Sequence, residues 1–368
     1  MVNKKLLTNF PRTLVVFLAL LSPSTVYAEP VLNGKKHPVQ QLVEWELIAN
    51  DAMTSDALNR MAIAVLENME DEEIPTGVNF PVTLAKFKEL SAIEKANEVA
   101  KLKLEDIKKV VLVPVKLKYL EIPQDQIAAL GNYSSHELKS QIGDQVKNTV
   151  YFEKNGKPYV RWFLHPLSGA KKSEISKAIE AKFQYTPKPV AGDFKFNFTS
   201  SRSMVVFKKD YDDAISLKVS LPAAEGPFKN KQIHLKEYTA WTRHNSYLAD
   251  LLPENSTENM LFLNEPVGLG AGVKGAEDAF LSRDLNDLPK RRRYYLPAFS
   301  MLDSETGAKI AALNGSDNPL KFWEKNFLEP MAKGLAELRA KTGAEHTSPH
   351  SQNIMVELDE NMKPTGKV

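Results

Sequence analysis

The densest group of chemically capable side chains lies in the nine residues from Glu345 to Asn353, which read Glu-His-Thr-Ser-Pro-His-Ser-Gln-Asn. Carboxylate, imidazole and amide groups can bind a metal ion or face a phosphate group. His346 and His350 have the i, i+4 spacing of helical zinc ligands. However, Pro349 lies between them and disfavours that helix, and the Glu-x-x-His arrangement of metalloproteases is absent. Phosphate chemistry is therefore favoured over zinc for this cluster.

Three further groups of polar and cationic side chains occur earlier in the chain. They are His165-Pro-Leu-Ser-Gly-Ala-Lys-Lys172, Thr199-Ser-Ser-Arg-Ser203, and Lys218 in the middle of the strand-like Ile215-Ser-Leu-Lys-Val-Ser-Leu-Pro222. Each has an ordinary alternative interpretation, as a strand end, a turn and a solvated strand residue. Taken together, the cations and hydroxyls can stabilise the negative charge that develops on transferring oxygens. The guanidinium of Arg202 adds a bidentate fork for phosphate or carboxylate.

Hydrophobic spacing predicts the elements that must position these groups. Apolar residues recur at three- and four-residue spacing in a helical N-terminal region, 29–107. A mixed, mainly antiparallel sheet region follows over 108–290, beginning with the β-rich Val110–Tyr119. The region 291–368 is expected to be helical, with one helix ending at a glycine cap, Gly343, before the tail cluster. This order predicts the α+β class.

The glycine-rich segment Glu265–Gly275 permits two interpretations. Backbone N–H groups of glycine-rich turns can hold a phosphate. The segment lacks the Gly-Lys-Ser/Thr ending of a P-loop, and no clear strand leads into it. A mobile loop is therefore the favoured prediction.

The N-terminal 28 residues have the pattern of an export signal. A positive region with Lys4, Lys5 and Arg12 precedes a short apolar run, and small residues end at Ala28. We therefore expect an exported, periplasmic or secreted protein, with an uncleaved inner-membrane anchor as the alternative. After cleavage no later segment is apolar enough to cross a membrane.

Composition narrows the classes of partner. Loss of the signal removes three positive charges from a formal net charge of +2, leaving about −1, so no electrostatic case exists for nucleic acid binding. The chain has no cysteine, which excludes disulfides, thiolate zinc sites and cysteine nucleophiles.

In order along the chain, the motifs resemble those of the NRPS-independent siderophore synthetases, the aerobactin synthetase (IucA/IucC) family. That family has His-Pro-x-His-Pro-x-x-Lys, Ser-x-Arg-Thr, a strand lysine, Thr-x-Ala-x-Arg, and a long helix leading to Glu-Ala-His-x-Gln-Asn. The matching residues here are His165, Lys172, Ser200, Arg202, Ser203, Lys218, Arg243, Glu345, His350, Gln352 and Asn353. The second His-Pro is replaced by Ser168-Gly169, and four residues separate Glu345 from His350 where the family motif has one. The similarity covers about residues 160–368.

The resemblance implies a hand-like fold and an ATP-dependent ligase. Such enzymes adenylate a carboxylate, typically of citrate, and condense it with an amine or hydroxyl. By this resemblance His350, Arg202 and Lys218 are the catalytic candidates, and Glu345 and Asn353 are the Mg²⁺ candidates. The candidates for holding ATP are Ser200, Ser203, Arg243, His165, Lys172, Gln352 and Asn353. Family members continue into a C-terminal portion that we expect to be short or missing here.

The sequence is compatible with two functions. The first is a ligase that uses ATP and Mg²⁺ with small carboxylate and amine substrates, and a homodimer is compatible with it. The second is an exported, non-catalytic protein on the same scaffold that binds a polycarboxylate, a phosphate ester or a ferric chelate. The predicted export signal bears on the choice, because exported compartments hold little ATP.

Overall fold

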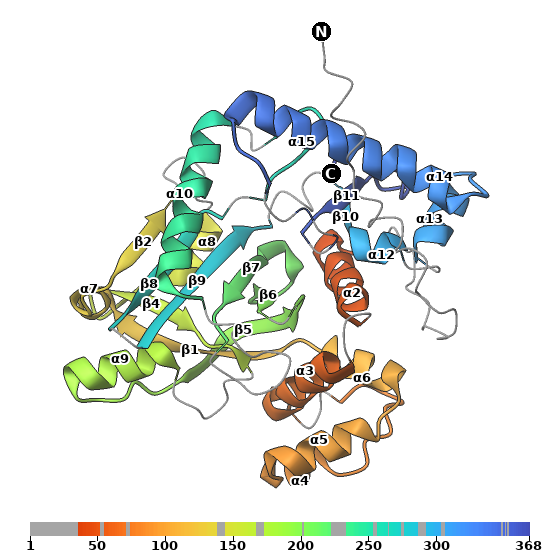
Figure 1. Cartoon of the computed structure of the whole chain (residues 1–368). Helices are drawn as coiled ribbons and strands as arrows, with labels where there is room; N and C mark the ends of the chain where they lie inside the picture. The colour runs from red at the N-terminus through yellow and green to blue at the C-terminus, as the bar shows by residue number, and fades with distance from the viewer. Residues whose placement is uncertain are drawn as a thin grey trace.

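The structure, a computed structural model, describes most of the chain beyond its N-terminal segment (Figure 1). The described residues are 36–51, 55–70, 74–137, 144–166, 173–200, 202–221, 233–252, 256–263, 265–273, 276–285, 292–302, 306–346, 349, 351 and 353–368. The predicted export signal lies outside these ranges. Among the described residues, no helix is long and apolar enough to cross a membrane.

The protein is a mixed helix-and-strand molecule built on a curled antiparallel sheet, which is consistent with the predicted class. Nine strands pair in the order β2-β8-β9-β7-β6-β5-β1-β4-β3. Their bounds are β1 Val115–Pro123, β2 Ser134–Glu137, β3 Tyr151–Lys154, β4 Lys157–Phe163, β5 Val190–Phe198, β6 Ser203–Phe207, β7 Ile215–Val219, β8 Val267–Val273 and β9 Ala276–Asp284. The curl brings β4 back toward β9, since the rings of Trp162 and Phe280 pack edge to face 5.3 Å apart.

The two faces of the sheet have different roles. Alternate side chains point to opposite faces, so Ile215, Leu217 and Val219 of β7 enter the main core on one face. The residues between them, Ser216 and Lys218, point to the other face. That outer face is partly covered by helices, and it is the face that holds the candidate site.

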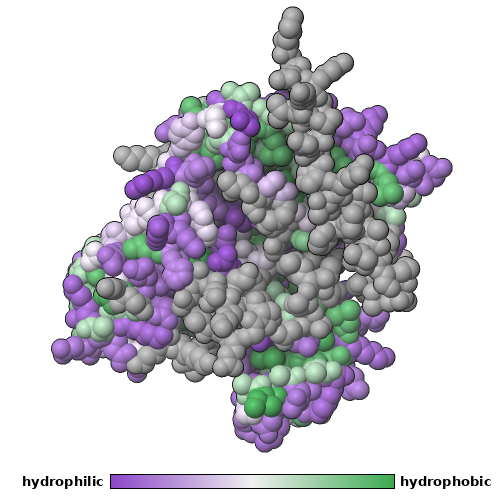
Figure 2. Space-filling view, in the orientation of Figure 1, coloured by the Kyte–Doolittle hydropathy of each residue, from purple (hydrophilic) through white to green (hydrophobic). Residues whose placement is uncertain are grey.

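Helices contact strands over most of the sheet, from β8 and β9 to β4 and β3. Their bounds are α2 Pro38–Asp51, α3 Ser55–Asn68, α4 Leu84–Glu89, α5 Ala92–Ala100, α6 Leu104–Val111, α7 Gln124–Ala129, α8 Asp144–Val150, α9 Glu174–Phe183, α10 Leu235–Leu251, α12 Ala298–Leu302, α13 Thr306–Leu313, α14 Pro319–Trp323 and α15 Glu329–Thr342. Figure 1 shows α10 and α2 on either side of β6, β7 and β9. In the view of Figure 2, hydrophobic side chains gather over α3–α5, and the remaining coloured surface is mainly hydrophilic.

The expected strand at Val110–Tyr119 is wrong in its first half. Residues Leu104–Val111 form α6, and β1 begins only at Val115. The reason is the spacing of Ile107, Val110 and Val111, which are all buried on one side of a helix. These β-branched residues adopt a helical conformation here, because burial of their side chains outweighs their preference for strands.

The C-terminal part is also less helical than predicted. A second, two-stranded sheet joins β10 (Tyr294–Pro297) to β11 (Met355–Leu358). Between them, a π-helical segment at Glu324–Leu328 leads into α15. The predicted glycine cap is confirmed, because Gly343 has φ 70° and its N–H donates to the carbonyl of Arg339.

The glycine-rich segment is a strand, not the mobile loop that its composition favoured. Gly268 and Gly270 of β8 lie beneath the ring of Tyr238 on α10. A Cβ atom at Gly268 would lie 2.9 Å from that ring and 2.7 Å from Leu281, and one at Gly270 would lie 2.8 Å from the ring. The glycines therefore allow α10 to approach the sheet closely.

Candidate functional site

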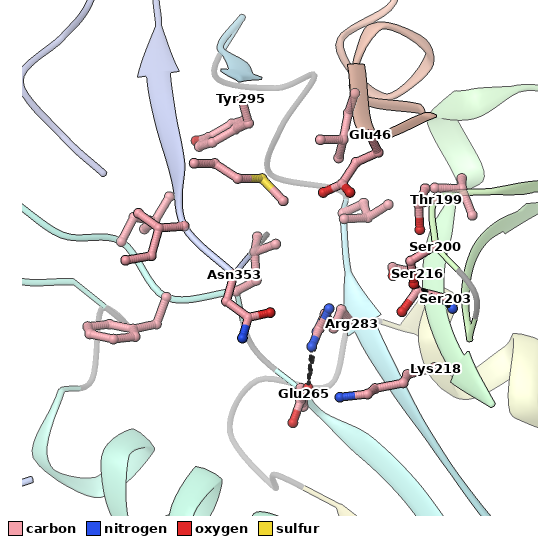
Figure 3. Close-up of a pocket in the computed structure, with 18 of the residues that line it drawn as sticks. Glu46, Thr199, Ser200, Ser203, Ser216, Lys218, Glu265, Arg283, Tyr295 and Asn353 are labelled. Carbon is pink, nitrogen blue, oxygen red and sulfur yellow. Dashed lines mark hydrogen bonds and ion pairs between the residues drawn. The ribbon is translucent and has the colours of Figure 1, made fainter. Parts of the chain in front are cut away.

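A cavity of about 570 Å³ lies on the outer face of the sheet, between α2, α10 and the C-terminal segment (Figure 3). Segments from both ends of the chain and from its middle form its wall. The lining residues are Leu42, Glu46, Thr199, Ser200, Arg202, Ser203, Val205, Ser216, Lys218, Asn245, Met260, Leu261, Phe262, Leu263, Glu265, Arg283, Leu285, Tyr295, His346, Asn353, Ile354, Met355 and Val368. Its volume lies within the usual range for sites that bind small molecules.

Strand pairing explains why the polar residues meet. Ser203 of β6 is directly opposite Lys218 of β7, and Ser216 is directly opposite Arg283 of β9. Paired residues of antiparallel strands project on the same side, so these four side chains share the cavity face. The sheet register thus brings together residues that are far apart in sequence.

The Ser-Ser-Arg-Ser segment is the tight connection between β5 and β6. The hydroxyl of Ser200 accepts hydrogen bonds from the N–H groups of Arg202 and Ser203, at 3.4 and 3.1 Å. The N–H of Val219 donates to the carbonyl of Arg202 at 2.9 Å. Ser200 therefore fixes the turn, and the turn fixes Arg202 beside Lys218.

Lys218 is a largely buried cation that lies within electrostatic reach of two carboxylates, Glu265 and Glu237. Its ammonium lies 4.5 Å from the ring centroid of Trp241, and it forms no ion pair with any residue that the structure describes. Desolvation by burial, assisted by the charges of Arg283 and Arg202 and opposed by Glu265, lowers the pKa of Lys218 to about 8. Lys218 therefore remains mainly charged at pH 7.

One buried carboxylate partly balances these cations. Glu265 is bound by Arg283, with an Nε–Oε1 distance of 3.0 Å, and it accepts a hydrogen bond from the amide of Asn245. Its pKa is held below the usual range; burial, the largest influence, acts in the opposite direction and is outweighed by Arg283, Asn245 and Lys218. Among the described lining residues at this end, one carboxylate thus faces three cations, Arg202, Lys218 and Arg283. The charge of Glu237 on α10, which does not line the cavity, also acts on Arg202 and Lys218.

A second carboxyl group that lines the cavity, Glu46 of α2, adds little negative charge. Glu46 is 7 % exposed, and burial raises its pKa to about 8 despite the opposing charge of Arg283. At pH 7 it is mainly protonated and can donate a hydrogen bond. Figure 3 shows it on the opposite side of Arg283 from Lys218.

The tail cluster contributes some of its residues to the cavity. Asn353 and His346 line it. Glu345 does not, since it is exposed and pairs with Arg339 on α15, with an Nη1–Oε1 distance of 2.6 Å. His350 and Gln352 lie outside the described residues.

The other candidates are not brought to the cavity wall. His165 is 3 % exposed and packs against Phe198 in the protein interior, at a ring distance of 5.8 Å. Arg243 is exposed on α10, on a different side from Trp241 and Asn245, which are four residues apart and share a helix face. Lys172 lies outside the described residues.

The side chains that line the cavity suit an oxyanion better than they suit a metal ion. Cations and hydroxyls at one end and a sufficient volume suit a polyphosphate. Among the described residues no group of three His, Cys, Asp or Glu is placed to hold a metal ion. Asn353 and Glu345, the predicted Mg²⁺ ligands, do not form such a group.

Sequence patterns missed the residues contributed by distant segments, namely Glu46, Glu265, Arg283 and Asn245. Glu265 precedes the glycine-rich stretch and Arg283 lies among other polar residues, Ser282 and Asp284, so local sequence does not single out either side chain. No protein-family model matches the chain, and no curated protein is significantly similar to it.

Proposed function

We propose that the cavity binds ATP and a small polycarboxylic acid and activates one carboxylate as an acyl-adenylate, on a hand-like scaffold of the siderophore-synthetase type. The observation that carries the proposal is the position of Lys218. A largely buried ammonium without an ion-pair partner among the described residues is costly, and a bound oxyanion would offset that cost. Arg202 and Ser203 lie beside it with further donors.

In the proposed reaction, a carboxylate oxygen of the acid attacks the α-phosphorus of ATP and pyrophosphate leaves. An amine or hydroxyl then attacks the acyl carbon, releases AMP and loses its proton. Arg202 and Lys218 stabilise the charge on the phosphate oxygens, and Ser203 donates a hydrogen bond. Asn353, on the facing segment, is a polar contact for the same ligand, and His350 of the tail cluster is the candidate for stabilising charge at the acyl centre.

The test is pyrophosphate release from ATP and Mg²⁺ with citrate and related acids. Arg202→Ala is expected to lower kcat/KM by at least about tenfold, since it removes a charged hydrogen-bond donor. Arg243→Ala is the matched control, because it removes an exposed arginine outside the cavity. Equal loss in both variants would contradict the assignment of Arg202.

A second candidate is an exported protein that binds the oxyanion without chemistry. The predicted export signal favours it, since ATP is scarce in exported compartments. Calorimetric binding of citrate without pyrophosphate release would support this alternative over the ligase. Absence of binding by both ATP and citrate would overturn both.

A further inference from the structure

The sheet face of the cavity changes from cationic to apolar along the strands. Ser203 and Lys218 form one cross-strand row, and Val205, Ser216 and Arg283 form the next. Two residues further along the same strands, Phe207, Ala214 and Leu285 belong to one apolar cluster. Each step of two residues spans about 6.6 Å, so the apolar row lies about 13 Å from the row of Lys218 and about 6.6 Å from the row of Arg283.

The apolar cluster forms the far end of the cavity. Its members come from α2, β6, β10, β11 and the segments beside β8 and β9. Those that also line the cavity are Leu42, Val205, Leu261, Leu263, Leu285, Tyr295 and Met355. Figure 3 shows Tyr295 and Glu46 at the end opposite Lys218 and Glu265. This end therefore offers mainly apolar contact area, and Arg283 lies between it and Lys218.

Glu46 is the only acidic side chain at that end among the described lining residues. It lies one helical turn from Leu42 on α2, so both project from the same face of the helix. Because burial keeps its carboxyl mainly protonated at pH 7, it adds a hydrogen-bonding group without adding charge. The two ends of the cavity thus favour different parts of one ligand.

We propose that the ligand is an oxyanion carried on an uncharged, apolar body, with the oxyanion at Lys218 and Arg202 and the body against Tyr295 and Met355. The inference rests on the proposed oxyanion binding and deepens it by specifying the rest of the ligand. A compact polycarboxylate occupies only the cationic end in this arrangement.

The test compares ligands of equal charge that differ in their apolar body. Methyl phosphate and phenyl phosphate are titrated into the whole protein at pH 7, and acetate and phenylacetate form a second pair that distinguishes phosphate from carboxylate ligands. Phenyl phosphate is expected to bind at least about tenfold more tightly than methyl phosphate, because the ring buries apolar area. Met355→Thr is expected to reduce this advantage and to leave methyl phosphate affinity unchanged.

Met331→Thr is the matched control, since Met331 is a partly buried methionine of α15 outside the cavity. Equal affinity for the two members of both pairs would overturn the inference and leave oxyanion binding intact. The inference would also be overturned if phenyl phosphate binds more tightly than methyl phosphate by the same factor in Met355→Thr, in Met331→Thr and in the wild type. Failure of all four ligands to bind would overturn the oxyanion site and this inference together.

Discussion

At the scale of single residues, the cavity contains two side chains whose pKa values are shifted in opposite directions. Burial lowers the pKa of Lys218 to about 8 and raises that of Glu46 to about 8. Both groups are held by the fold in an environment that opposes their charged forms. Displaced pKa values in a cavity are typical of functional sites, because a purely structural position is more stable with an apolar residue.

Lys218→Met tests whether burial of the Lys218 ammonium destabilises the folded protein. Methionine keeps the length of the side chain and removes the desolvation of a charge, so the melting temperature is expected to stay equal or to rise. The control is Lys118→Met, an exposed lysine in the middle of β1. A melting temperature clearly lower for Lys218→Met than for Lys118→Met would indicate that Lys218 stabilises the fold through Glu265 and Trp241.

Glu46→Gln tests the raised pKa of the α2 carboxyl. Because the folded protein holds this proton more tightly than the unfolded chain, the contribution of Glu46 to stability decreases as pH rises from about 4.5 to about 8 and is constant above. Glutamine does not titrate, so the variant is expected to gain stability relative to the wild type across that window. The measurement is the free energy of unfolding by denaturant at several pH values.

Asp278, whose pKa burial also raises, to about 7, is present in both proteins and cancels in the difference. A difference in unfolding free energy that is constant from pH 5 to pH 8 would mean that Glu46 is already ionised in the folded protein.

At the scale of elements, the site depends on how closely α10 approaches β8. The ring of Tyr238 lies over Gly268 and Gly270, and α10 also supplies Asn245 and Trp241 near Lys218. The two glycines are therefore part of the positioning of the site, although neither lines the cavity.

Gly268→Ala is expected to destabilise the protein by about 1–3 kcal/mol, because the new Cβ would overlap Tyr238 and Leu281. Thermal unfolding measures the change. The double variant Gly268→Ala/Leu281→Ala opens space beside the new methyl group but loses a buried leucine. Non-additive effects in this cycle are expected, since the two residues are in contact. Strict additivity would argue against the close approach.

Element types were predictable where local chemistry decides them. Gly343 was recognisable as a cap, and Ser200–Ser203 as a turn between strands, because both depend on nearby backbone geometry. Val110 and the glycines of β8 were misread, because a helix face and a helix-to-strand approach are set by tertiary packing.

At the scale of the whole molecule, the cavity exists only because distant segments meet on one sheet face. The order of the motifs assigns Ser203 and Lys218 to one site, and the strand register places them directly opposite each other on β6 and β7. Glu46 and Arg283 could not be assigned from sequence, since nothing local in α2 or β9 specifies that they face the same space. The family resemblance selects Arg202 and Lys218, which both line the cavity, but equally His165 and Arg243, which lie elsewhere.

The central claim is that Lys218 and its neighbours bind an oxyanion, and calorimetric titration of pyrophosphate at pH 7 tests it most directly. Wild-type protein and the Lys118→Met control are expected to bind equally. Lys218→Met is expected to bind at least about tenfold more weakly, as loss of a charged hydrogen bond requires. Equal affinity of all three proteins, or absence of binding to the wild type, would contradict the claim.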